Sequence, residues 1–337
     1  MKSIALSLFV ALLLPQGSSP SPKDVEPGLN LLTPPSSPSF VQRVQPAVVG
    51  IGVRVPLDSP SALTLGPARW GSGVIFDPAG YAVTVSYILL DAEEIQVALR
   101  DGRVIPAKLI GLDLEYGLGV IKLEGDGPWP AASLGDSSKV AVGEATATIG
   151  VNDENNLVVT QGSVKEIRRF AGYWEYMIDR AFIVAPSNPA FGGSPLVNVQ
   201  GEIIGILSLR LGEPPFVNLA IPIEHLRASR DELISQGRVA SRPPRPWLGL
   251  YTVPTEDGLV VAGTSPNGPA RQAGFQRGDV LMRLNGEKVE SQEEFYRKLW
   301  QSKVGQEVTL VVLRDSRFEV ITVRPVDRYQ FVRIRGK

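Results

Sequence analysis

The stretch SNPAFGGSPLVN, Ser187 to Asn198, holds the residue types of a hydrolytic site. A serine in a tight, glycine-rich turn just before an apolar strand is the usual setting of a hydroxyl nucleophile. Such a nucleophile needs an imidazole base to take its proton and a carboxylate to orient that imidazole. The chain has one histidine, His225, and no cysteine, so a histidine base has one candidate and thiolate chemistry is excluded.

Short apolar segments dominate the first two thirds of the chain. Examples rich in Val and Ile and bounded by Gly, Pro or Asp are AVVGIGVRV, GSGVIFD, GYAVTV, LGVIKL and EIIGILSL. These segments have the length and composition of strands, and RDGR (100–103) predicts a hairpin turn. Many strands at this spacing predict an all-β barrel or sandwich between residue 41 and about residue 208.

Two later segments predict helices. Residues 221–237 carry apolar residues at helical spacing and end on a glycine. Residues 291–301 begin with a serine that is followed three positions later by Glu294, which is the pattern of a capping box. Phe295 and Leu299 lie four positions apart and therefore share one face of this helix.

Five motifs, in order, resemble those of the HtrA family, in which a trypsin-like protease precedes a PDZ domain. They are GSGVIFDPAGYAVTVSYIL, LDLEYGLGVIKL, SLGDSSKVAVGEATATIG, SNPAFGGSPLVNVQGEIIGI and LAIPI. With the C-terminal part, the resemblance covers roughly residues 41–326. It implies a mainly β fold, a trypsin-like double six-stranded β-barrel followed by an α+β PDZ domain.

The same resemblance places the family's catalytic positions on residues that cannot perform the reaction. The histidine position falls on Tyr87, the aspartate position on Gly117 and the serine position on Gly192, with separations of 30 (87 to 117) and 75 residues (117 to 192). A phenol with a pKa near 10 is a poor base, and glycine offers no side chain. Ala190 replaces a family glycine, and its Cβ disfavours the turn that aims the oxyanion-binding amides.

Three other side chains could serve a relocated site. Ser194 lies two residues beyond the nucleophile position, where we expect a turn or strand-start serine. His225 lies at the start of the helix that leaves the barrel, and we expect it to pack there. Lys122 could form a Ser–Lys dyad, but we expect an exposed strand residue. The sequence shows no metal-ligand cluster, and we expect neither a metal nor a cofactor.

The C-terminal region keeps the expected features of a peptide-binding module. PWLGL resembles the carboxylate-binding loop of HtrA PDZ domains, in which successive backbone N–H groups hold the terminal carboxylate of a peptide. Two helix residues are expected to line the groove and to favour an apolar final residue. The predicted peptide-binding residues are Trp247, Leu248, Gly249, Leu250, Phe295 and Leu299. Arg245 either adds positive charge near the carboxylate or is a solvated linker charge.

The N-terminus predicts export. Lys2 precedes an apolar run, Ile4–Leu14, that is too short to span a bilayer. Residues 1–19 are therefore a signal peptide or, alternatively, an uncleaved anchor, and residues 20–40 are a Pro/Ser-rich leader. Export without cysteines is compatible with a bacterial periplasm or cell surface. The expected later segments are a barrel domain at 41–237, a linker at 238–246, a PDZ domain at 247–326 and a tail at 327–337.

These observations predict an exported HtrA-like pseudoprotease without triad-based proteolysis. It would bind C-terminal or unfolded polypeptide segments through its PDZ domain, as an adaptor, a chaperone or a regulator of an active HtrA relative. A net charge of −1 argues against a nucleic-acid partner. Two alternatives stay open: a serine endopeptidase of the family with a non-standard site, and a structural oligomerisation platform, for which the resemblance weakly implies a homotrimer.

Overall fold

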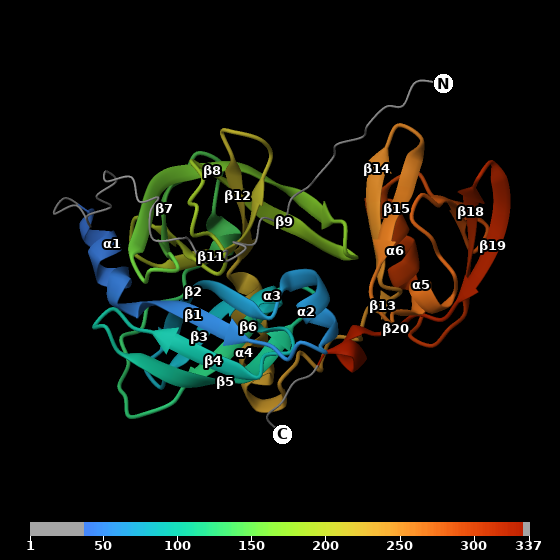
Figure 1. The fold of residues 1–337 in the computed structure, drawn as a ribbon. Coiled ribbons are helices and arrows are strands. Elements are labelled where there is room, and N and C mark those ends of the chain that lie inside the picture. Colours follow the sequence, from blue (N-terminus) through green and yellow to red (C-terminus); the bar gives the residue numbers. More distant parts are fainter. Residues whose placement is uncertain (1–36, 333–337) are drawn as a thin grey trace, which may run out of the picture.

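The computed structural model describes residues 37–332. It contains two closed, six-stranded antiparallel barrels and a smaller C-terminal domain built on a separate sheet (Figure 1). The predicted mainly β architecture is confirmed. The predicted signal peptide and nearly all of the leader lie outside the described residues, as does the end of the tail.

The first barrel closes in the strand order β1-β2-β3-β6-β5-β4. Its β-branched and leucine side chains fill the interior, and Val74, Val83 and Val120 are fully buried. The strands are β1 (Val48–Arg54), β2 (Ala68–Asp77), β3 (Tyr81–Val85), β4 (Glu94–Ala98), β5 (Val104–Asp113) and β6 (Leu118–Leu123).

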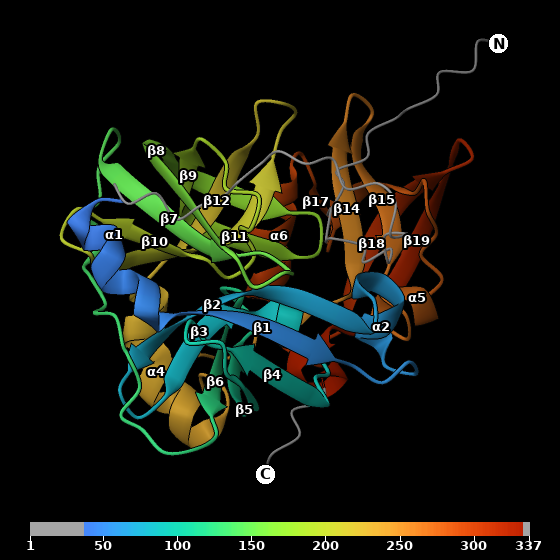
Figure 2. The ribbon, with the colours of Figure 1, turned by 60° about the vertical axis from the view of Figure 1, so that its left-hand side comes forward.

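The second barrel closes in the order β10-β11-β12-β9-β8-β7. Its strands are β7 (Ala145–Val151), β8 (Leu157–Gly172), β9 (Tyr176–Ala185), β10 (Pro195–Asn198), β11 (Ile203–Leu211) and β12 (Val217–Pro222). The β8–β9 hairpin is long, and its tip extends out of the barrel toward the C-terminal domain (Figures 1 and 2).

The C-terminal domain holds a sheet in the order β14-β15-β16-β18-β19, with β17 paired to β16. A separate two-stranded sheet joins the domain's two ends, β13 and β20. The strands are β13 (Pro246–Trp247), β14 (Leu250–Thr255), β15 (Gly258–Thr264), β16 (Val280–Leu284), β17 (Glu287–Lys288), β18 (Val308–Arg314), β19 (Arg317–Val323) and β20 (Val326–Asp327).

The helices are few and short. The α-helices are α1 (Ser39–Val44), α2 (Pro60–Leu65), α3 (Ser86–Leu89), α4 (Glu224–Gln236), α5 (Pro269–Gln272) and α6 (Gln292–Gln301). The 3₁₀ helices are η1 (Gln45–Ala47), η2 (Ser137–Lys139) and η3 (Arg328–Phe331). Both predicted helices form: α4 ends at Gly237 in the left-handed conformation, with φ 78°, and α6 begins after Ser291.

The N-terminus of α6 differs from the predicted capping box in one contact. The Ser291 hydroxyl accepts a hydrogen bond from the Glu294 N–H at 3.2 Å, as expected. The Glu294 carboxylate accepts from the N–H of Glu290 at 3.0 Å, one residue before the cap. The Glu294 carboxylate thus reaches Glu290, one residue before the N-cap, in the loop that precedes the helix.

The predicted linker and tail both contact the first barrel. Arg242 forms ion pairs with Asp113 and with Glu115. The Tyr329 hydroxyl, from η3, donates to the Leu112 carbonyl at 2.8 Å. One contact comes from the segment before the C-terminal domain and the other from the segment after it. Both ends of that domain are therefore attached to the first barrel. The domain limits proposed from the sequence stay a prediction.

Candidate functional site

Tyr87 and Gly192, which the resemblance places at the histidine and serine positions, lie side by side. A Cβ added at Gly192 would be 3.1 Å from the Tyr87 hydroxyl oxygen. That hydroxyl donates to the carbonyl of Ser208 at 2.9 Å. Burial raises the pKa of the Tyr87 phenol. The side chain at the base position therefore keeps its proton and uses it in a structural hydrogen bond.

Gly117 lies in the turn between β5 and β6 with φ 79°. Its N–H donates to the Asp113 carbonyl at 2.8 Å, and its carbonyl accepts from the Ser86 N–H at 2.8 Å. A Cβ added here would be 3.3 Å from the Tyr176 hydroxyl oxygen, which donates to the Tyr116 carbonyl at 2.8 Å. The ring of Tyr176 thus covers Gly117, the position at which the resemblance places the family's carboxylate.

The loop before β10 uses its polar groups internally. The Ala190 N–H, at the position of an oxyanion-binding amide, donates to the Asn188 side-chain oxygen at 2.9 Å. The Ser194 N–H donates to the Phe191 carbonyl at 2.9 Å. The Ser194 hydroxyl is fully buried and donates to the Ala190 carbonyl. This is the structural role predicted for Ser194, within a turn that leads into β10.

The two candidate bases of a relocated site also have structural contacts. His225, on α4, stacks against the ring of Tyr116 with the ring centroids 3.6 Å apart. Burial lowers the pKa of His225 to about 4, so its imidazole is neutral at pH 7. Lys122, on β6, donates to the Ala79 carbonyl and lies 4.5 Å from the centre of the Tyr81 ring. The stacking of His225 agrees with the packing expected for it. Lys122 lies on a strand as expected, but it is partly buried rather than exposed.

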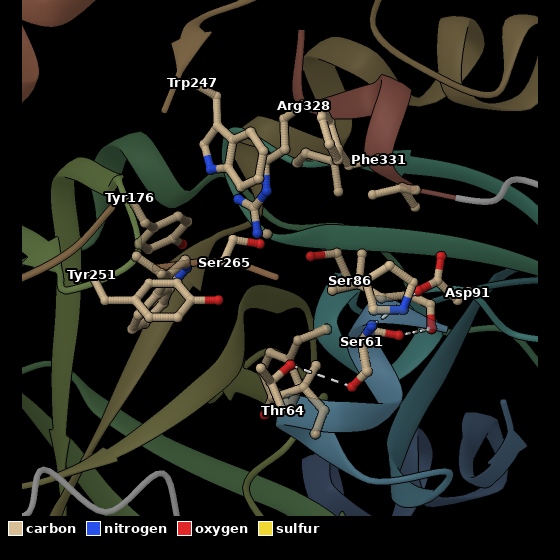
Figure 3. Close-up of a pocket in the computed structure, with 18 of the residues that line it drawn as sticks. Ser61, Thr64, Ser86, Asp91, Tyr176, Trp247, Tyr251, Ser265, Arg328 and Phe331 are labelled. Atoms are coloured by element: carbon tan, nitrogen blue, oxygen red, sulfur yellow. Dashed lines mark hydrogen bonds between the residues drawn. The ribbon is translucent and has the colours of Figure 1, made fainter. Parts of the chain in front are cut away.

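A cavity of about 190 Å³ lies between the region around Tyr87 and Gly117 and the C-terminal domain (Figure 3). Figure 3 shows the Arg328 guanidinium pointing into it near Ser265, with the rings of Tyr176, Tyr251 and Trp247 around it. The other lining residues that matter here are Ser86, Tyr87, Gly117, Tyr173, Trp174 and Phe331. Sequence reasoning missed this cavity because its walls come from segments far apart in the chain.

The predicted carboxylate-binding loop holds a carboxylate, and that carboxylate belongs to the same chain. The Leu248 N–H donates to one carboxylate oxygen of Glu175 at 3.0 Å, and the Leu250 N–H donates to the other at 2.7 Å. Glu175 lies at the tip of the β8–β9 hairpin and is 6% exposed. Trp247 is buried and packs against Phe331, with the ring centroids 5.1 Å apart.

Phe295 and Leu299 are fully buried, which differs from the open groove that the sequence suggested. Both belong to a hydrophobic cluster that also contains Leu248 and Met177. Met177 comes from β9, so the hairpin contributes an apolar side chain to the core of the C-terminal domain. The peptide-binding roles of the six predicted residues stay a prediction.

Arg245 has contacts that neither sequence interpretation foresaw. Its guanidinium lies 3.3 Å from the Glu115 carboxylate and 4.2 Å from the centre of the Trp300 ring.

Within residues 37–332, no helix is long and apolar enough to cross a membrane. The same residues contain no group of three or more His, Cys, Asp or Glu side chains that could hold a metal ion.

Two family models match the chain: the trypsin-like peptidase domain over residues 71–206 and the PDZ domain over residues 246–324. The serine endoprotease DegS of Escherichia coli is 29% identical over 352 residues, which covers 94% of each chain. A Halomonas elongata protein, named a probable periplasmic serine endoprotease DegP-like, is 33% identical over 268 residues. That match covers 75% of this chain and 55% of the relative, so the chain spans about half of that protein's length.

Solved structures give the same result. The HtrA-type protease AlgW with a decapeptide is 26% identical, with a TM-score of 0.52 over 87% of this chain and 98% of that one. The serine endoprotease from Yersinia pestis is 27% identical, with a TM-score of 0.52 over 86% and 96%. Because the two models match in this order, and because the matching structure of AlgW is that of an HtrA-type protease, the chain belongs to the HtrA family, with a trypsin-like domain followed by a PDZ domain.

Proposed function

We propose that this protein is an exported HtrA-like pseudoprotease that binds polypeptide segments through its PDZ domain. It acts as an adaptor, a chaperone or a regulator and performs no triad-based proteolysis. The observation that carries the proposal is the degenerate cleft. Tyr87 stands beside Gly192 with its hydroxyl bound to a carbonyl, and the Tyr176 ring lies against Gly117. A nucleophile, a base and an orienting carboxylate are all required for the acyl-transfer mechanism.

The names of the relatives favour the alternative, a serine endoprotease with a non-standard site. The contacts of its candidate residues argue against it. The Ser194 hydroxyl is fully buried and donates to the Ala190 carbonyl. His225 is stacked on Tyr116, and its lowered pKa makes the imidazole a weak base. A relocated site would have to break these contacts before catalysis.

Peptide binding by the PDZ domain is supported by two observations. An HtrA-type protease has been solved with a tripeptide and with a decapeptide. In this chain the Leu248 and Leu250 amides already bind a carboxylate, the chemical group that ends every peptide. We therefore propose C-terminal or unfolded segments as partners, with Trp247, Gly249, Phe295 and Leu299 completing the site.

The name of one relative, a probable periplasmic serine endoprotease, supports our proposal that this protein is exported to a bacterial periplasm.

We also propose that the protein forms homo-oligomers and that an active HtrA relative is one of its partners. Light scattering of the full-length protein, alone and mixed with such a relative, tests both. A monomer at every concentration that forms no complex would contradict them.

Casein, an unfolded protein, tests the proposed function. Purified full-length protein and its Ser194→Ala variant are incubated with fluorescein-labelled casein. We expect both proteins to bind the casein, measured by anisotropy, and to leave it intact on a gel. Cleavage by the native protein that the Ser194→Ala change abolishes would establish the endoprotease alternative, and failure of both proteins to bind would remove the adaptor role.

A further inference from the structure

The PDZ peptide-binding loop is occupied by the tip of the β8–β9 hairpin, residues 172–177. We propose that this tip is an internal ligand of the PDZ domain, which a peptide with a free C-terminal carboxylate must displace. The inference rests on the proposed peptide binding and adds its regulation.

The first support is the chemistry of the contact. Two backbone N–H groups, two residues apart, each donate to a different oxygen of the Glu175 carboxylate, at 3.0 Å and 2.7 Å. A terminal carboxylate presents the same pair of oxygens to such a loop. The Glu175 carboxyl group and a terminal carboxylate would therefore compete for the same two backbone donors. Arg328 adds positive charge near Glu175.

The second support is the backbone contact beside the carboxylate. β14 is an edge strand of the sheet, and its Thr252 N–H donates to the Tyr173 carbonyl at 2.8 Å. A bound peptide adds to an edge strand through main-chain bonds of this kind. The Tyr296 hydroxyl of α6 donates to the Gly172 carbonyl at 2.7 Å and accepts from the Glu175 N–H at 3.1 Å. The tip therefore contacts both β14 and α6.

The third support is the backbone conformation of Glu175, which has φ 56°. This left-handed region disfavours residues with long side chains. The other non-glycine residues with positive φ in the described part of the chain are all short and polar: Asp91, Asn155, Asn267, Asn285, Asp315 and Ser316. The contacts with the PDZ domain hold Glu175 in a conformation that its own type does not favour.

The test compares three full-length proteins: native, Glu175→Gln and Glu166→Gln. Glu166 is the matched control, because it is an exposed glutamate on the same hairpin that pairs only with Arg168 in the described structure. The probe is a pool of fluorescein-labelled decapeptides with random internal positions and a free C-terminal Leu, Val, Ile or Phe. The same pool with C-terminal amides controls for the carboxylate. Binding is followed by fluorescence anisotropy.

We expect the free-acid pool to bind Glu175→Gln about tenfold more tightly than the native or Glu166→Gln protein, because the groove is no longer self-occupied. The amide pool should show no such gain. Equal affinity of the acid pool for all three proteins would overturn the internal ligand and leave the proposed function standing. No binding of the acid pool to any protein would refute the PDZ groove itself, and the internal ligand with it.

Hydrogen exchange on the native protein provides a second readout that does not depend on how the variant folds. Addition of a saturating acid pool should raise amide exchange in residues 172–177 at least fivefold, while exchange in the second-barrel strand β11 stays unchanged. A bound peptide that leaves the exchange of the hairpin tip unaltered would contradict the displacement.

Discussion

One loop in each domain resembles a functional loop of the HtrA family. The first resembles the catalytic loop, and the second resembles the carboxylate-binding loop. The loop at 187–198 depends on side chains for its chemistry, and we propose that the residues at the family's catalytic positions no longer provide them. The loop at 246–250 depends on backbone amides, and the Leu248 and Leu250 N–H groups still bind a carboxylate. Under this proposal, the comparison teaches that a site made of backbone groups tolerates sequence change, whereas a catalytic triad does not.

The largest expected effect tests whether the first loop now has a purely structural role. Gly193 has φ 84°, and a Cβ there would lie 2.0 Å from the Ser72 carbonyl oxygen. We predict that Gly193→Ala lowers the free energy of unfolding by more than about 4 kcal/mol, because backbone strain and overlap act together. Chemical denaturation measures the change.

Gly143→Ala is the control for Gly193→Ala. Gly143 also has a positive φ, 89°, but an added Cβ would meet no atom within 4 Å. Only the strain is then expected, with a loss of about 1 kcal/mol. Equal losses for the two variants would show that the loop is not tightly packed against the first barrel.

The next effect concerns pH and the second loop. Burial raises the pKa of Glu175 from 4.5 to about 7, although Arg328 and the loop amides act in the opposite direction. Tyr296 faces it from α6. Between pH 4.5 and 7 the folded protein binds more protons at this group than the unfolded chain does. Its contribution to the free energy of unfolding therefore falls by about 3 kcal/mol as pH rises through this window.

Denaturation of the native and Glu175→Gln proteins at several pH values between 4.5 and 7 checks this prediction. The native protein should lose stability relative to the variant as pH rises, since glutamine does not titrate. Parallel pH profiles would mean that the Glu175 carboxyl is not buried against the PDZ loop.

A smaller effect is expected at Tyr296, which is fully buried and bonded to two backbone groups of the hairpin. Tyr296→Phe should cost about 2 kcal/mol, because the Gly172 carbonyl and the Glu175 N–H lose their partner. Tyr81→Phe is the control, since no described residue hydrogen-bonds to that hydroxyl. We expect its loss to stay below about 0.5 kcal/mol. Similar losses at both sites would argue against a stable contact between hairpin and PDZ domain.

Much of the fold could be predicted from the sequence because its signals are local. Runs of Val and Ile bounded by turn residues predicted the strands. Ser291 marked the start of one helix, and Gly237 marked the end of another. The family motifs then fixed the order of the two domains. These features depend on residues that are close in the chain.

The occupied PDZ loop could not be predicted in the same way. Glu175 and Leu248 are 73 positions apart, and no periodicity connects a hairpin tip with a loop in another domain. The only local signal is the tip sequence GYWEY, which places a glutamate among aromatic residues. The cavity beside Arg328 was missed for the same reason, because its walls come together only in the folded chain.

The central claim is that the trypsin-like domain no longer has a reactive serine. The most direct measurement is the intact mass of the full-length native protein after incubation with a fluorophosphonate, with trypsin as the positive control. The account predicts no mass increase on this protein while trypsin is fully labelled. A single adduct on a serine, removed by Ser194→Ala, would contradict it.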